Sequence, residues 1–219
     1  MPSTISWIDH DPVARERSLK ILAFFQEKES RDELGIGAIR DSFADQLFPG
    51  TSTIQTRLRY MLFVPWLYKK LEKKRIPSQE FNARLATEEF NLIDPLLKGE
   101  DHAGVFGRIA GRQLKRYPSS VYWAGLGSWG IRYGTFGQLS QDQYHRHLNT
   151  IYKNRDSILQ RTRDKTKLEG DLNEILAEDL ITWHPQIPTL PQDFPNVDFA
   201  LTLDEAQFIL DRLRDSHPK

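Results

Sequence analysis

Apolar residues recur at helical spacing along most of this chain. Ile36, Ile39, Phe43 and Leu47 fall on one face of a helix with 3.6 residues per turn, and this run stops at Phe48-Pro49-Gly50. Apolar spacing and the local start and stop signals predict helices over residues 12–27, 36–47, from about 52 with a bend near Val64, 78–97, 104–117, from 118, 140–159, 168–183 and 202–215. The pattern therefore predicts an all-α fold, a multi-helix bundle.

Local signals support the beginnings of several of these helices. A Ser or Thr followed three residues later by Gln or Glu forms a capping-box pattern, in which each side chain accepts a hydrogen bond from the other residue's backbone amide. This pattern occurs at Ser52 with Gln55, Ser140 with Gln143, and Thr202 with Glu205. Pro65 lacks an amide donor, so the helix that contains it should bend near Val64.

One segment near the C-terminus is rich in proline. Residues 184–195 contain four prolines, which favour an extended segment that either wraps on the surface or links two units. The predicted organisation is a helical domain over 1–183, a Pro-rich linker over 184–198 and an acidic C-terminal helix over 199–219.

Charge is distributed unevenly along the chain, although the formal net charge is zero. Residues 104–167 carry 12 Lys and Arg against three Asp, whereas residues 168–219 carry 11 Asp and Glu against three Lys and Arg. The middle segment should attract polyanions, which makes nucleic acid the first partner to consider. The acidic face of the last helix is either solvated or covers the basic segment as an intramolecular mimic of nucleic acid; it comprises Asp204, Glu205, Asp211 and Asp215.

A helix-turn-helix-like pair is predicted near the N-terminus, between Leu34 and Arg75, with residues 48–51 as the turn. On the wheel of the second helix, polar side chains able to contact phosphates and base edges lie opposite the apolar arc. This face is either a nucleic-acid contact or an ordinary solvated surface. The candidate nucleic-acid-binding residues on this face and further along the helix are Gln55, Thr56, Arg57, Arg59, Tyr60, Lys69 and Lys70.

A second basic cluster lies in the predicted helix 104–117. Arg108, Arg112 and Arg116 are four residues apart and would form one ridge, with Lys115 beside it. Like charges at this spacing repel unless an anion faces them. Phosphate groups of nucleic acid would fill that role, and so would the chain's own acidic tail. These four residues complete the predicted nucleic-acid-binding site.

The chain carries no motif for catalysis, a cofactor or a metal. Gly125-Leu-Gly-Ser-Trp-Gly130 has the G-x-G-x-x-G spacing but lacks the strand context of a dinucleotide-binding turn, so we expect a tightly packed aromatic hairpin there. His145 and His147 point apart on a helix, and no G-x-S-x-G nucleophile motif occurs. We therefore predict a protein that is not an enzyme and binds neither a cofactor nor a metal.

Cysteine content and the length of the apolar stretches indicate the cellular compartment. The absence of cysteine excludes disulfides and fits a reducing compartment, so we expect the cytoplasm. The longest apolar stretch, residues 60–68, is nine residues long and contains Pro65, whereas a spanning helix needs about 20 residues. No membrane partner is expected.

Two stretches carry a family resemblance. Ser30–Leu67 (SRDELGIGAIRDSFADQLFPGTSTIQTRLRYMLFVPWL) and Gly104–Arg132 (GVFGRIAGRQLKRYPSSVYWAGLGSWGIR) resemble the N-terminal part of an uncharacterised bacterial family, a domain of unknown function associated with antiphage defence gene neighbourhoods. The resemblance implies a defence context and other defence-system proteins as partners, but no activity. Members of this family look longer, which raises the expectation that this chain is a shorter form without a C-terminal unit.

Two functions fit this sequence. The first is a nucleic-acid-binding component of a bacterial antiviral defence system, with duplex DNA preferred to RNA. The alternative is a non-catalytic scaffold or adaptor, whose oppositely charged surfaces dock onto partner proteins or, as a homo-oligomer, onto another copy of the chain.

Overall fold

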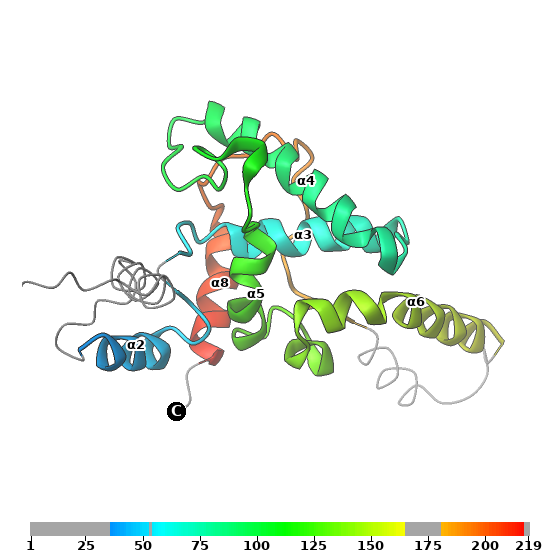
Figure 1. The fold of residues 1–219 in the computed structure, drawn as a ribbon. Helices are drawn as coiled ribbons and strands as arrows, with labels where there is room; N and C mark the ends of the chain where they lie inside the picture. The colour runs from blue at the N-terminus through cyan, green and yellow to red at the C-terminus, as the bar shows by residue number, and fades with distance from the viewer. Residues whose placement is uncertain (1–35, 53, 165–180, 217–219) are drawn as a thin grey trace, which may run out of the picture. The chain divides into compact units, whose positions relative to one another are not determined.

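The computed structural model describes residues 36–52, 54–164 and 181–216. Within these ranges the regular elements are six α-helices and two short 3₁₀ helices, with no sheet, which confirms the predicted all-α class (Figure 1). The elements are α2 (Ile36–Leu47), α3 (Tyr60–Lys73), α4 (Ser78–Lys98), η2 (Gly111–Gln113), α5 (Pro118–Ser128), η3 (Gly134–Gln138), α6 (Gln141–Asp164) and α8 (Leu203–Ser216).

The chain divides into two compact units, residues 1–43 and 44–219. Helix α2 crosses this division and confirms the helix predicted over 36–47. Its four apolar side chains Ile36, Ile39, Phe43 and Leu47 are all exposed. The helix predicted over 12–27 lies outside the described residues.

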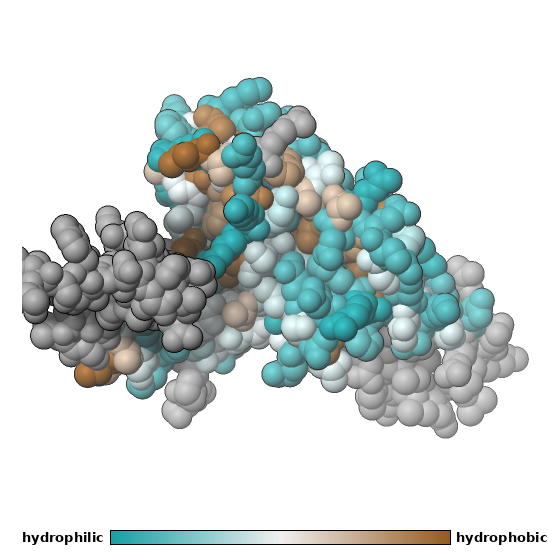
Figure 2. Space-filling model, in the orientation of Figure 1, coloured by the Kyte–Doolittle hydropathy of each residue, from teal (hydrophilic) through white to brown (hydrophobic). Residues whose placement is uncertain are grey.

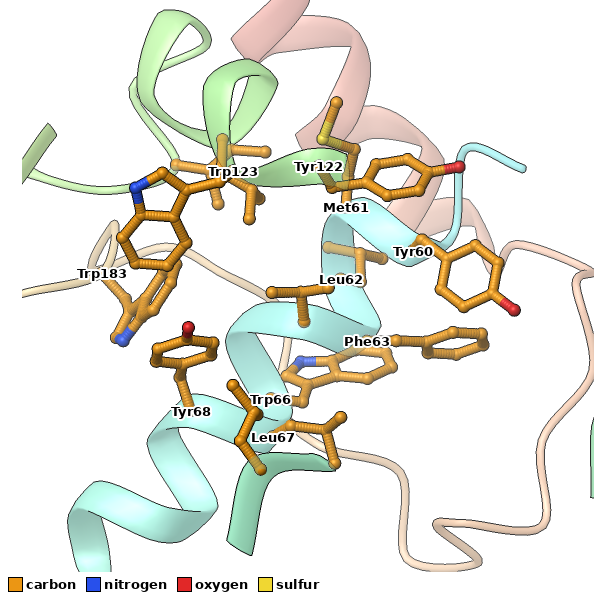
Figure 3. Packing of buried hydrophobic residues seen from close by; sticks show 14 of the residues in the cluster. Tyr60, Met61, Leu62, Phe63, Trp66, Leu67, Tyr68, Tyr122, Trp123 and Trp183 are labelled. Atoms are coloured by element: carbon orange, nitrogen blue, oxygen red, sulfur yellow. The ribbon is translucent and has the colours of Figure 1, made fainter. Parts of the chain in front are cut away.

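The core of the second unit is built around α3. Every side chain from Tyr60 to Tyr68 is buried, so this helix is enclosed on all sides, as a helix that is apolar around its whole circumference must be (Figure 3). Pro65 lies inside the continuous helix. Buried residues of α4, α5, α6, α8 and the segment around Trp183 belong to the same hydrophobic cluster as those of α3.

Helix α3 begins at Tyr60, so the prediction that it begins near residue 52 is wrong. The Gln55 side chain does not cap a helix; its amide group donates to the carbonyls of Gly50, at 3.2 Å, and Val121, at 3.1 Å. The amide of Arg57 donates to the hydroxyl of Tyr122 at 3.0 Å. These contacts with α5 hold residues 55–57 outside a helical turn.

Two of the predicted capping boxes form. The amide of Ser140 donates to the Gln143 side chain at 2.8 Å, and the amide of Thr202 donates to Glu205 at 3.0 Å. They precede α6 and α8, and α4 also matches its predicted range within one residue at its end. Most of the helix predicted over 168–183 lies outside the described residues, but Trp183 itself forms an isolated antiparallel bridge with Arg132.

The helix predicted over 104–117 is wrong. The segment consists of turns and the three-residue η2. Gly104, Gly107 and Gly111 have φ angles of +76°, +83° and +50°, in the left-handed region that a right-handed helix excludes. The small residues that would form one face of a helix instead allow successive turns.

The Pro-rich segment packs against α3 inside the second unit. Ile187 is buried, and the indole of Trp66 donates to the carbonyl of Pro188 at 2.7 Å. Phe194 contacts the rings of Phe63 and Trp66. The segment, which turns at residues 185–186 and 192–195, therefore packs on the unit that also contains α8.

Candidate nucleic-acid interface

The second helix of the predicted helix-turn-helix pair does not present a recognition face. Tyr60 is 1% exposed, and its hydroxyl accepts a hydrogen bond from the amide of Phe106 at 3.1 Å. Burial raises the pKa of Tyr60 far above its ordinary value. The prediction that Arg59 and Tyr60 lie opposite the core is wrong, because α3 is buried on every side over its first nine residues.

Arg59 is a buried cation whose partners come from the acidic tail. Its side chain is 6% exposed and donates to Glu205 at 2.8 Å and to the Asp198 carboxylate at 3.0 Å. The guanidinium also lies 5.5 Å from the centre of the Phe63 ring. Arg59 therefore holds the beginning of α8 against the beginning of α3.

The other candidates around α3 also have internal partners. Arg57 forms an ion pair with Asp101 and donates to the carbonyl of Ala103, while the Thr56 hydroxyl donates to the carbonyl of Gly104 at 2.6 Å. These contacts position the segment that leads out of α4. They leave Arg57 little freedom to bind a separate anion.

The two lysines of α3 differ in their surroundings. Lys70 is half-buried, forms an ion pair with Glu88 at 2.7 Å and lies 5.9 Å from the centre of the Phe194 ring. Lys69 is exposed, although partial burial of its ammonium group lowers its pKa. Of this pair, only Lys69 faces solvent.

Residues 105–117, the later part of the connection between α4 and α5, form what we call the basic loop (Figure 1). Val105 is buried at its beginning, and the Phe106 ring packs edge-on against Tyr60 with 5.2 Å between centroids. At its end the Tyr117 ring packs edge-on against Phe90 at 5.5 Å. The loop is thus attached to the core at both ends.

The carboxyl group of Glu89 fixes the beginning of α5 directly after the loop. It accepts hydrogen bonds from the Ser119 amide at 2.6 Å and the Ser119 hydroxyl at 3.1 Å. Glu89 is 3% exposed, and burial raises its pKa to about 8. A carboxyl group in this position occupies the positive end of the helix dipole of α5.

Between these attachments the loop exposes cations. Arg108, Lys115 and Arg116 are exposed, and none of them forms an ion pair with any carboxylate in the described part of the chain. Ile109 beside them is 92% exposed. The side chain of Arg112 lies outside what the structure describes. The predicted ridge of a helix is replaced by a turn-rich loop that carries the same charges.

The acidic tail neutralises Arg59 but not the basic loop. Besides the contacts of Asp198 and Glu205 with Arg59, Asp215 pairs with Arg212 at 2.6 Å within α8. Among the described residues, no carboxylate of α8 is paired with the basic loop. Residues 103–141 contain neither Asp nor Glu, a signal in the sequence that could have located this surface.

The described residues offer no metal site, because no group of three or more His, Asp or Glu side chains among them could hold an ion. In the same residues no helix is both long enough and apolar enough to cross a membrane. The Gly125–Gly130 motif ends α5 and begins the turn after it, and Trp129 there donates to the carbonyl of Pro49 at 2.9 Å. It has a packing role in a helix end rather than in a hairpin.

Comparison with known proteins identifies one family. The model of a family of unknown function, DUF6361, matches residues 2–144, which is more than half of the chain. That match contains no link to antiphage defence. Neither the curated proteins nor the solved structures include a match to the chain.

Proposed function

This chain belongs to the DUF6361 family of unknown function, and we propose that it binds nucleic acid, duplex DNA in particular, through the basic loop. The observation that carries the proposal is the set of three exposed cations, Arg108, Lys115 and Arg116, which have no carboxylate partner among the described residues. In contrast, the cations at Arg57, Arg59 and Lys70 have internal partners and serve the fold.

The loop has the properties that a phosphate-binding element needs. Arg guanidinium groups bind phosphate oxygens in a bidentate geometry, and they are more weakly hydrated than Lys ammonium groups. Because both ends of the loop are packed on the core, less backbone entropy is lost on binding than with a free tail. Ile109, which lies next to Arg108 in the turn and is 92% exposed, offers an apolar side chain of the kind that minor-groove-binding proteins insert between base steps.

The test is the salt dependence of binding to a duplex without a chosen sequence. Neutralisation of each phosphate contributes about 0.9 to the slope of log affinity against log salt. The variant Arg108→Ala/Lys115→Ala/Arg116→Ala should therefore reduce this slope by up to about 3. An unchanged slope would exclude the loop from the interface, and no binding by the wild type at low salt would exclude the function.

The matched control removes three exposed cations elsewhere in the same unit. Lys73→Ala/Lys74→Ala/Lys153→Ala changes the net charge by the same amount at the end of α3 and on α6, where all three side chains are exposed. It should leave the slope within about 1 of the wild-type value. An equal loss in both variants would mean that net charge, rather than the basic loop, governs binding.

The defence context is a further part of the proposal and rests on the resemblance of residues 30–67 and 104–132. We infer that the chain acts within a bacterial antiviral assembly. Phage plating on cells that carry the gene neighbourhood with the wild-type chain or with the loop variant tests this inference. If phage plate equally well on cells with either chain, the basic loop has no role in defence.

An adaptor function is supported by a different observation. Ile36, Ile39, Phe43 and Leu47 lie on one face of α2 and are 54%, 57%, 60% and 58% exposed. Brown atoms mark apolar surface where α2 lies in the view of Figure 2. Continuous apolar faces of this kind are typical of protein contacts. Oligomers or protein complexes that form regardless of DNA and are lost in Ile39→Ser/Phe43→Ser would favour the adaptor.

A further inference from the structure

The basic loop carries an isolated apolar side chain among its cations. Ile109 is 92% exposed, a larger fraction than for any other large apolar residue in the described part of the chain. Single apolar side chains are common on protein surfaces, so exposure alone assigns no role to it. The way in which the fold holds Ile109 is more informative.

The turn that carries Ile109 is closed by backbone hydrogen bonds. The amide of Gly111 donates to the carbonyl of Gly107 at 2.7 Å, and the amide of Arg108 donates to the carbonyl of Val105 at 3.2 Å. Gly107 and Gly111 have φ angles of +83° and +50°, so the chain turns sharply both before and after Ile109. The exposed side chain therefore belongs to a backbone whose conformation is already fixed.

The base of this turn is supported by the core. Val105 is buried, and the amide of Phe106 donates at 3.1 Å to the hydroxyl of Tyr60, which lies at the beginning of α3 (Figure 3). At Gly107 a Cβ would lie 2.7 Å from Ile93 Cδ1, so the backbone there lies directly against α4. A side chain that separates stacked bases works against their stacking, and it needs a support of this kind.

The residues after Ile109 keep the tip of the turn small. Ala110 and Gly111 are exposed, and a Cβ built on Gly111 would meet no atom within 4 Å. The minor groove of B-DNA is about 6 Å wide, so only a tip without bulky neighbours brings a side chain to its floor. Arg108 and Gln113, both exposed, are side-chain types with which proteins contact this groove.

We propose that the basic loop enters the minor groove and inserts Ile109 between two base pairs, which bends the duplex. This inference rests on the proposed function and adds a substrate class to it, namely duplexes whose base steps unstack readily. Pyrimidine–purine steps such as TA are easily kinked, whereas A-tracts are stiff. The chain should therefore prefer a duplex with a central TA step to one with an A-tract at that place.

A membrane surface is a weaker partner for the same features. Cations beside an apolar residue also occur in proteins that bind anionic lipids, but even a myristoyl chain gives only marginal membrane binding. Ile109 offers much less apolar surface than such a chain. Between two base pairs, in contrast, a single side chain is covered on both of its faces.

The test measures affinity and bending together, with the full chain and end-labelled duplexes of about 20 base pairs. Fluorescence anisotropy gives the affinity, and energy transfer between the two ends reports the bend. The wild type should bend the TA duplex by roughly 20–90°. Ile109→Ala should abolish the bend and weaken binding by about 10-fold, because most of the inserted apolar surface is removed. Its salt dependence should stay that of the wild type, because the phosphate contacts remain.

Two further variants serve as controls. Leu203→Ala removes a side chain that is 83% exposed at the beginning of α8, outside the loop, and should change neither affinity nor bend. Ile109→Leu keeps the apolar volume and should retain most of both. Aminopurine, a fluorescent base analogue placed beside the central step, should brighten on unstacking with the wild type and Ile109→Leu but not with Ile109→Ala.

The outcomes separate this proposal from the proposed function. If the wild type does not bind the duplex at all, the proposed function itself fails. If it binds with the full salt dependence while Ile109→Ala matches it in affinity, bend and aminopurine emission, only the insertion of Ile109 is wrong. The same conclusion follows if Leu203→Ala weakens binding equally, or if Ile109→Ala lowers binding to phosphatidylserine vesicles without changing the duplex complex.

Discussion

The contact of Arg59 with Glu205 gives a stability prediction that separates a buried ion pair from an exposed one. In Arg59→Leu, the carboxylate of Glu205 keeps its 4% exposure but loses the cation 2.8 Å away. An orphaned buried charge costs more than the contact it loses, because its desolvation is no longer offset. Glu205 also accepts from the Thr202 amide at 3.0 Å, so it cannot turn toward water without leaving the cap of α8.

The magnitude follows from this burial. Removal of one partner from a buried ion pair typically costs about 3–5 kcal/mol, a large part of the 5–15 kcal/mol that stabilises a domain. The matched control is Arg57→Leu, because the Arg57 side chain is 27% exposed and its partner Asp101 is 62% exposed. Exposed pairs contribute about 0–1 kcal/mol, and the lost contact with the Ala103 carbonyl adds about 1 kcal/mol.

Equilibrium unfolding in urea measures both variants against the wild type. The midpoint should fall much further for Arg59→Leu than for Arg57→Leu, with similar slopes. A second change, Glu205→Gln in the Arg59→Leu background, keeps an oxygen for the Thr202 cap and removes the orphaned charge, so it should restore part of the loss. If Arg59→Leu lowers the free energy of unfolding by no more than Arg57→Leu does, the ion pair of Arg59 with Glu205 does not hold α8 against α3.

Three further variants test other buried contacts. Burial raises the pKa of Glu89 from 4.5 to about 8, so between these pH values the folded state holds a proton that the unfolded state releases. The free energy of unfolding should therefore fall as the pH rises from about 4.5 to about 8. Glu89→Gln should reduce the difference in stability between about pH 5 and about pH 8, measured by unfolding in urea. Gly107→Ala should destabilise the chain by more than about 1 kcal/mol in thermal unfolding, because φ is +83° and a Cβ would lie 2.7 Å from Ile93 Cδ1; an unchanged melting temperature would contradict the loop geometry. Tyr144→Phe removes a donor to the buried carboxylate of Glu72 and should cost about 1–3 kcal/mol in the same assay.

The helices that the sequence predicts well are those whose signals are local. The Thr202–Glu205 capping box and the proline at the start of α5 act within one helical turn, so both signals can be read from the local sequence. The apolar stripe that begins at Ile36 likewise depends only on spacing. Each of these elements begins within about one residue of its predicted position, because no distant contact competes with the local preference.

The failures occur where distant contacts decide. Gln55 bonds to the carbonyl of Val121, 66 positions away, and so leaves the helix that its local pattern favours. Gly104, just before the basic loop, and Gly107 within it can serve a helix interface or a turn, and periodicity does not separate these roles. At Gly107 a Cβ would lie 2.7 Å from Ile93 Cδ1, so packing against a distant residue leaves room only for glycine in this turn. Sequence spacing alone contains neither contact.

The charged residues of the candidate site also depend on contacts that the sequence does not show. The net charge of a segment sums all its ionised groups, but an external phosphate interacts strongly only with cations that have no internal partner and remain near the surface. Arg59 meets Asp198 and Glu205, which are 139 and 146 positions away in the sequence, and is thereby lost to any ligand. Arg108 and Arg116 lie in a stretch free of carboxylates and are exposed in the folded chain. The distance in sequence to the nearest carboxylate is therefore a better guide than net charge to cations that stay exposed and unpaired, but it serves only where the fold does not bring a distant carboxylate back.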